Sequence, residues 1–200
     1  MNEQLKKAKD FFYKKDYLSA KDIFLEMDDT YGAGLCFLLM GDFSSARKYF
    51  QTKENDCTAS SFGLVVLDIL EDKPKKNPTY FQVRCFLEIY INLFVENNMF
   101  NFAQKLIDNY GFFTNVNFET PKFIARVLNA NDYNNSVHFF AQRATEVCTY
   151  DAEIYYIDAL VYIKEKNLDE AKKCIKTCLS FAPDYYPIKK LQSTIEKMSA

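Results

Sequence analysis

The sequence predicts an all-α protein built from consecutive helix hairpins. Its apolar residues recur in steps of three and four, which is the period of one helix face and not of a strand. Within residues 152–185, one such face carries Tyr155, Ala159 and Tyr162, and a second carries Leu168, Ala171, Ile175 and Cys178. A short polar turn, 164–167, separates the two faces. Gly and Pro number only 5 each in 200 residues, so the helices are rarely interrupted.

A small side chain recurs one turn into the second helix of each predicted hairpin. Ala159 and Ala171 lie twelve residues apart, one on each helix, where a small side chain lets two helices approach closely. Four other segments start with an aromatic residue and place a small residue three positions later: Ala20, Ala46, Ala103 and Ser136. Twelve residues before these lie Ala8, Gly34, Ile91 and Ile124. The two isoleucines predict wider crossings in the third and fourth hairpins.

The five small residues lie at positions 20, 46, 103, 136 and 171, and are separated by 26, 57, 33 and 35 residues. The last two intervals are close to the 34 residues of one tetratricopeptide repeat. The first implies a shortened hairpin, and the interval of 57 leaves room for an extra helix, 58–70, whose register stays open. The chain therefore resembles the tetratricopeptide repeat (TPR) family. This resemblance implies a right-handed superhelical solenoid of TPR-like hairpins, with about 11–12 helices and a capping helix at its C-terminal end.

The first part of the chain predicts helices over 2–14, 17–27, 31–40 and 43–51, followed by the extra helix 58–70. Asp16 and Asp42 each precede a helix, as an N-cap residue does. Gly41 ends the third helix. The stretch Glu71–Pro78 holds two prolines among charged and amide residues, so no helix runs through it. We expect one solenoid domain over 1–200, with a seam at 71–78.

The second part predicts helices over 79–96 and 100–110, and the latter is expected to end at Gly111. Residues 112–119 look irregular, and Thr120 is expected to cap a helix with Pro121 at its first position. Asp132 and Asn167 are the candidate N-caps of two later helices, the latter with Glu170 as a capping-box partner. The last helix, 185–198, has Ile188, Leu191 and Ile195 on one side, as expected of a capping helix.

Composition excludes several classes of function. The net charge of -2 and the pI of about 5.6 give no basic surface for nucleic acid. No run of 18 apolar residues is free of charge, so no membrane insertion is expected. The first residues lack the apolar core of a signal peptide, which predicts a cytoplasmic chain. The six cysteines follow no disulfide rhythm and are expected to be free thiols.

No constellation of residues predicts catalysis. The single histidine, His138, has no partners at metal-ligand spacing, and the chain lacks a Gly-rich phosphate loop and a nucleophile elbow. Cys174 and Cys178, four residues apart, are the one candidate for thiol-dependent redox chemistry or soft-metal binding. We therefore expect no enzyme activity, no cofactor and no metal.

The TPR resemblance implies that the first helices of the hairpins line a concave groove for partner peptides. The non-packing faces of these helices nominate Phe12, Tyr13, Tyr31, Leu35, Leu38, Leu39, Glu88, Asn92, Val95, Tyr156, Leu160 and Ile163. Such a groove is apolar near both ends and acidic in the middle, which favours an apolar or aromatic segment carrying a basic residue. We predict a non-enzymatic scaffold for a protein or peptide partner. The alternatives are a self-associating protein whose groove is its own interface, or another helix of the chain covering that surface.

Overall fold

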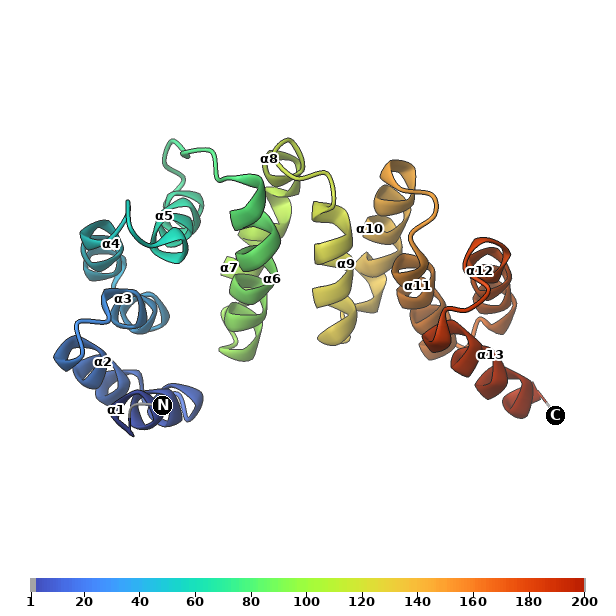
Figure 1. Ribbon diagram of the computed structural model, residues 1–200, viewed down its shortest axis with the longest axis horizontal. Helices are drawn as coiled ribbons and strands as arrows, with labels where there is room; N and C mark the ends of the chain where they lie inside the picture. Colours follow the sequence, from blue (N-terminus) through green and yellow to red (C-terminus); the bar gives the residue numbers. More distant parts are fainter. Residues whose placement is uncertain (1–2, 200) are drawn as a thin grey trace. The chain divides into compact units, whose positions relative to one another are not determined.

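The protein is all-helical in the computed structural model, which describes residues 3–199, with side chains to residue 197 (Figure 1). These residues form thirteen α-helices, and none of them combines the length and the apolar character needed to cross a membrane. The chain divides into two compact units, Met1–Asn109 and Tyr110–Ala200. The predicted all-α succession of hairpins is confirmed, with more helices than expected.

The first unit begins with two helix hairpins, α1 (Glu3–Tyr13) with α2 (Tyr17–Glu26), and α3 (Thr30–Leu39) with α4 (Phe43–Thr52). Asp16 and Asp42 cap α2 and α4 as predicted, since their carboxylates accept the N–H groups of Ser19 (3.1 Å) and Ser45 (3.0 Å). Gly41, at φ 80°, makes the left-handed turn between α3 and α4, a conformation that glycine adopts without steric cost.

The core of the first unit is formed around α5 (Thr58–Leu70), in which every residue from Phe62 to Leu70 is buried. Buried Asp68 is paired with Arg47 of α4 at 2.8 Å, which satisfies its charge. The predicted bounds of this helix, 58–70, are confirmed. Because α5 is buried on nearly all sides, this extra helix forms the centre of the first unit.

Helix α6 (Tyr80–Glu96) packs against α5 and against α7 (Phe100–Asp108), which follows it in the chain. Tyr90 of α6 is fully buried, with its ring centroid 5.7 Å from that of Phe62 in α5. At the C-terminal end of α6, the carbonyl of Glu96 accepts the Lys15 ammonium, and Asn97 accepts the Tyr17 hydroxyl. Helix α6 therefore reaches from α5 to the turn between α1 and α2.

The polar stretch 71–78 lies inside the first unit, where ion pairs hold it. Asp72 accepts Lys105 of α7 at 2.6 Å, and Lys76 binds Glu54 at 2.6 Å. The boundary between the two units falls instead between Asn109 and Tyr110. The single domain with a seam at 71–78 stays a prediction.

The second unit contains α8 (Tyr110–Thr114), the hairpins α9 (Thr120–Ala130) with α10 (Asn134–Val147) and α11 (Ala152–Lys164) with α12 (Leu168–Phe181), and finally α13 (Tyr186–Ser199). Asn167 caps α12 as predicted, accepting the N–H of Glu170 at 3.3 Å. The buried cluster at this end joins α11, α12 and α13 through Ala159, Ala171, Ile175, Cys178, Ile188 and Ile195. The predicted capping role of the last helix is consistent with this packing.

The small residues predicted at the helix crossings are buried in four hairpins, including Ala103 of the third at 4% exposure. Ala8, Ala20, Ala159 and Ala171 are all fully buried. A Cβ added at Gly34 would lie 2.5 Å from the ring of Phe50. No larger side chain fits that crossing without displacing the ring.

The fourth hairpin shows that the predicted register was wrong by one residue. Ser136 is exposed, and its neighbour Val137 is fully buried. Twelve residues earlier lies Ala125, also fully buried, so the small residue of this crossing is on the first helix. With Val137 in place of Ser136, the last two intervals both become 34 residues.

Several predicted helix ends are also corrected. Asp132 does not cap α10, because it adopts φ 60° and its carboxylate binds Lys164 at 2.7 Å, so that Tyr133 takes the cap position. Gly111 does not end a helix but lies within α8, which occupies part of the stretch predicted to be irregular. Thr120 is the first residue of α9, not its cap, and its hydroxyl donates to the Asn117 carbonyl at 2.7 Å.

Candidate partner-binding site

A small apolar pocket opens between α1 and α3 in the first unit, with a volume of about 210 Å³. We call it the α1–α3 pocket. Its walls include four of the residues predicted to bind a partner, Phe12, Tyr13, Tyr31 and Leu35, together with Leu5. Tyr13 is 78% exposed at the edge, which is unusual for a side chain of this size. The helix periodicity of α1 and α3 therefore brings these side chains to one opening.

The floor of the pocket depends on an aromatic cluster. The ring of Phe12 packs edge-to-face against Tyr17 at 5.3 Å and Phe24 at 6.5 Å between centroids. A Cβ added at Gly32 would lie 2.6 Å from the Phe24 ring, so glycine makes room for that ring beneath α3. Phe24 and Gly32 belong to the packing side of their helices, so no surface pattern in the sequence nominates them for this pocket.

Two charged residues border the pocket, and they differ in their exposure and in the hydrogen bonds that they already form. Asp29 uses one carboxylate oxygen to cap α3, accepting the N–H of Gly32 at 2.8 Å. Lys9 is exposed on α1 and forms no ion pair within residues 3–199. Asp29 keeps its negative charge but is half-buried and hydrogen-bonded, so the exposed charge at the rim is the ammonium of Lys9.

The predicted groove does not continue openly along α3, where Tyr31 lies beside Tyr90 of α6. Tyr31 lies where the open pocket meets the packed interior of the unit, and burial raises its pKa to about 12. The pKa of neighbouring Tyr90 on α6 is raised well above its usual value, mainly by burial and further by Tyr31. Leu38 and Leu39 are buried, 0% and 4% exposed, so a partner cannot reach them as predicted. This part of the predicted surface is therefore used in packing within the chain.

The remaining predicted residues lie elsewhere and do not border the α1–α3 pocket. Glu88, Asn92 and Val95 are half-buried on α6. Tyr156, Leu160 and Ile163 are half-buried on α11 in the second unit, where the ring of Tyr156 lies 6.4 Å from that of Tyr185. The structure thus brings together four of the twelve nominated residues.

His138 belongs to a polar cluster that the sequence did not reveal. Its Nδ1 lies 2.5 Å from Asp158 and its Nε2 lies 3.1 Å from Glu165, both contributed by α11 and the turn after it. Its ring also stacks on Tyr162, with centroids 4.1 Å apart. The partners come from another hairpin, 20 and 27 residues away, so no local spacing indicates them. The arrangement holds α10 to α11.

The thiols near this cluster are not activated. Cys174 donates to Asp158 at 3.5 Å, and burial, followed by the charge of Asp158, raises its pKa to about 12. Burial also raises the pKa of Cys178. Since the thiolate is the reactive form, both cysteines are held in the unreactive state. No group of three or more His, Cys, Asp or Glu side chains suited to a metal ion occurs among the described residues.

Comparisons with known proteins give a distant likeness among solved structures. No family model matches the chain, and no curated protein matches it. Among solved structures, the chain is similar to YrrB, described as "a TPR protein with an unusual peptide-binding site". The two share 12% sequence identity over 95% of this chain and 90% of that chain, with a TM-score of 0.47. A likeness of this degree assigns the present chain neither a family nor a ligand.

Proposed function

We propose that this protein is a non-enzymatic binding module, and that the α1–α3 pocket receives one bulky apolar side chain of a partner peptide. The observation that supports this most directly is the meeting of Phe12, Tyr13, Tyr31 and Leu35 around a single opening. Because Tyr13 is so exposed, a ligand that covers its ring removes apolar surface from water, which contributes favourable binding free energy. The six free thiols suit a reducing compartment such as the cytoplasm.

The charge at the rim specifies the partner further. Sequence reasoning favours a basic residue in the ligand, but the residue available at this pocket is Lys9, and Asp29 is engaged as a helix cap. We therefore propose an acidic residue next to the apolar anchor of the peptide. Burial of one Leu or Phe side chain contributes about 1.5–3 kcal/mol, which the ion pair supplements.

The test uses three short fluorescent peptides that differ only at defined positions. The first has one Phe flanked by Glu residues, the second has the same Phe flanked by Lys, and the third has Ala in place of Phe. We expect the Glu–Phe peptide to bind best in fluorescence anisotropy. Tyr13→Ala should weaken it about tenfold, as for an anchor residue. Lys9→Glu should reverse the preference between the Glu and Lys peptides.

A matched control comes from the second unit. Tyr186 is 72% exposed and lies outside the pocket, so Tyr186→Ala removes a similar side chain without touching the proposed site. Equal losses in Tyr13→Ala and Tyr186→Ala would indicate nonspecific adhesion. Failure of the Glu–Phe peptide to bind better than its Ala twin would refute the proposal.

A further inference from the structure

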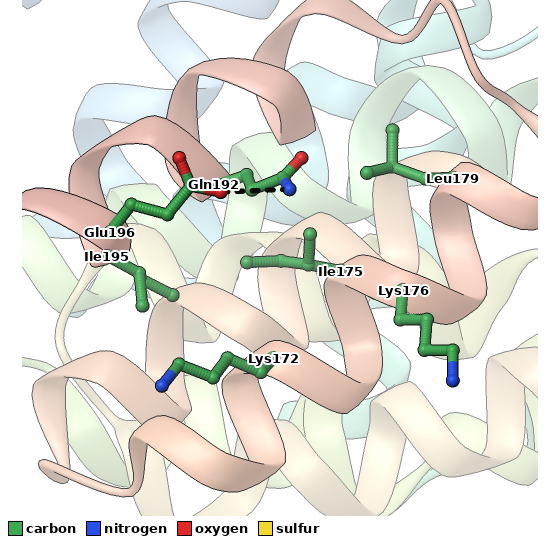
Figure 2. Close-up of a pocket in the computed structure, with 7 residues that line it drawn as sticks. All are labelled: Lys172, Ile175, Lys176, Leu179, Gln192, Ile195 and Glu196. Atoms are coloured by element: carbon green, nitrogen blue, oxygen red, sulfur yellow. Dashed lines mark hydrogen bonds between the residues drawn. The ribbon is translucent and has the colours of Figure 1, made fainter. Parts of the chain in front are cut away.

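A second hollow lies on the second unit, between α12 and α13, with a volume of about 430 Å³ (Figure 2). We call it the α12–α13 groove. Ile175 and Leu179 of α12 and Ile195 of α13 provide its apolar surface. Ile175 and Ile195 are 4% and 2% exposed and form the floor, while Leu179 is half-buried and open to a ligand. The stems of the bordering lysines extend this apolar surface.

The surroundings of α13 differ from those of α11. Helix α11 packs against α9 and α10 on one side and α12 on the other. In the described residues, the main packing partner of α13 is α12. The hollow between α12 and α13 is therefore bounded by two helices and open along its length, which is the shape that accepts a third helix.

The two edges of the groove carry different charges. Lys172 and Lys176, one turn apart on α12, form no ion pair in the part of the chain that the structure describes. Neighbouring Lys173 points to a different partner, Glu170 on the same helix. On the opposite edge, Glu196 accepts the amide of Gln192 at 3.1 Å (Figure 2). The positive charge that is free to meet a ligand therefore lies along the α12 edge alone.

We propose that the α12–α13 groove binds one amphipathic helix of a partner protein, with two acidic residues one turn apart beside its apolar stripe. The apolar stripe covers Leu179 and the lysine stems. The acidic pair faces Lys172 and Lys176, whose spacing of four residues matches one helical turn. This charge pattern fixes the orientation of the bound helix, because its acidic flank is repelled by Glu196.

The test exchanges charges between the protein and a designed helical peptide. The probe is a capped 16-residue peptide with Leu at i, i+3 and i+7 and Glu at two flanking positions four residues apart, and its twin has Lys at those two positions. We expect the Glu peptide to bind the wild-type protein in fluorescence anisotropy. In Lys172→Glu/Lys176→Glu, its affinity should fall about tenfold at low salt, and the Lys peptide should become the better ligand.

The control variant carries the same change in net charge. Lys173→Glu/Lys190→Glu alters exposed lysines of α12 and α13 that do not line the groove, so Glu-peptide affinity should stay within about twofold of wild type. Tyr13→Ala should also leave this binding unchanged, which separates it from the α1–α3 pocket. Circular dichroism verifies that each variant is folded.

Three results would overturn the proposal. The first is an equal loss of binding in both double-lysine variants, which reports net charge only. The second is a wild-type protein that binds neither peptide. The third is a wild-type dimer, seen by sedimentation, that Lys172→Glu/Lys176→Glu dissociates, because the occupant of the groove would then be a second copy of the chain.

Discussion

His138 joins two hairpins of the second unit through both of its ring nitrogens. Partial burial opposes a charge on the ring, but hydrogen bonds to Asp158 and Glu165 and the charges of these carboxylates outweigh it, so the pKa of His138 is raised. A raised pKa in the folded state means that the charged ring stabilises the fold. That contribution is complete below the unfolded pKa of about 6.5 and is lost as the pH rises through the folded value.

We predict that His138→Gln destabilises the protein more at pH 6 than at pH 9, by about 1 kcal/mol or less, as for other partly exposed pairs. Urea unfolding at the two pH values measures the difference. Since His138 is the only histidine, its imidazole signal in a proton NMR titration is assigned without further experiment. A folded-state pKa at or below 6.5, or equal destabilisation at both pH values, would contradict the prediction.

The sequence predicts a residue's position well where it depends on the periodicity of one helix, and poorly where it depends on contacts with residues distant in the chain. Phe12, Tyr13, Tyr31 and Leu35 meet because helix periodicity alone decides which face each one occupies. Leu38 lies on the same face of α3, yet it is buried in the core of the unit, where α5, about 20 residues later in the chain, packs against α3. No pattern within one helix reports such a contact, so the sequence could not indicate its burial.

Helix starts were predictable where the cap residue has a negative φ, as most residues do. Asp16 and Asp42 precede an aromatic residue and cap the next helix. Asp132 also precedes an aromatic residue, but its φ of 60° places it in the turn, and the helix starts later. Sequence pattern does not distinguish these two conformations of Asp, which is why the register of the fourth hairpin was wrong by one residue.

The crossing of α3 and α4 gives a test of the small-residue rule. We predict that Gly34→Ala destabilises the protein by about 1–3 kcal/mol, because the new methyl group would lie 2.5 Å from the Phe50 ring. Gly111→Ala is the matched control. Nothing lies within 4 Å of an added Cβ there, and alanine favours helix α8, so this change should be neutral or stabilising by up to about 1 kcal/mol.

Thermal and urea unfolding of both glycine variants provide the measurement. Opposite signs for the two substitutions support a crossing limited by van der Waals contact. Equal destabilisation by both would mean that backbone conformation, and not the contact with Phe50, decides the effect at Gly34.

At the scale of the whole chain, the six cysteines should differ strongly in reactivity. Burial raises the pKa of both Cys36 and Cys174 to about 12, and Cys178 is also buried, whereas Cys148 is exposed. We predict that Cys148 gives the fastest phase with Ellman's reagent at pH 8 in the native protein, and that all six thiols react after denaturation.

Cysteine variants identify the phases of this reaction. Cys148→Ser should remove the fast phase, and Cys174→Ser should leave it in place. If Cys174→Ser instead abolishes the fast phase, Cys174 is an activated thiol, and the redox alternative regains support.

The general architecture was predictable because each hairpin carries its own periodicity and its own small residues. The division of the chain into compact units is not visible in its composition. The polar, proline-containing stretch 71–78 has the composition of a boundary, yet Lys105 and Glu54 anchor it within the first unit. The boundary at Asn109 and Tyr110 lies between two short helices with ordinary composition. Where a chain divides depends on which contacts are formed in three dimensions.

The position of α6 limits how much of a partner the first unit can hold. A segment that enters the α1–α3 pocket meets Tyr31, and next to Tyr31 lies the buried ring of Tyr90. A longer binding site would require α6 to be displaced. This displacement would expose Tyr90 and Phe94 to water, with an unfavourable free energy of several kcal/mol. For the proposed complex we therefore expect a footprint of about one anchor side chain and its neighbours. Such contacts dissociate quickly, so lasting attachment requires a partner that repeats the motif and binds through avidity.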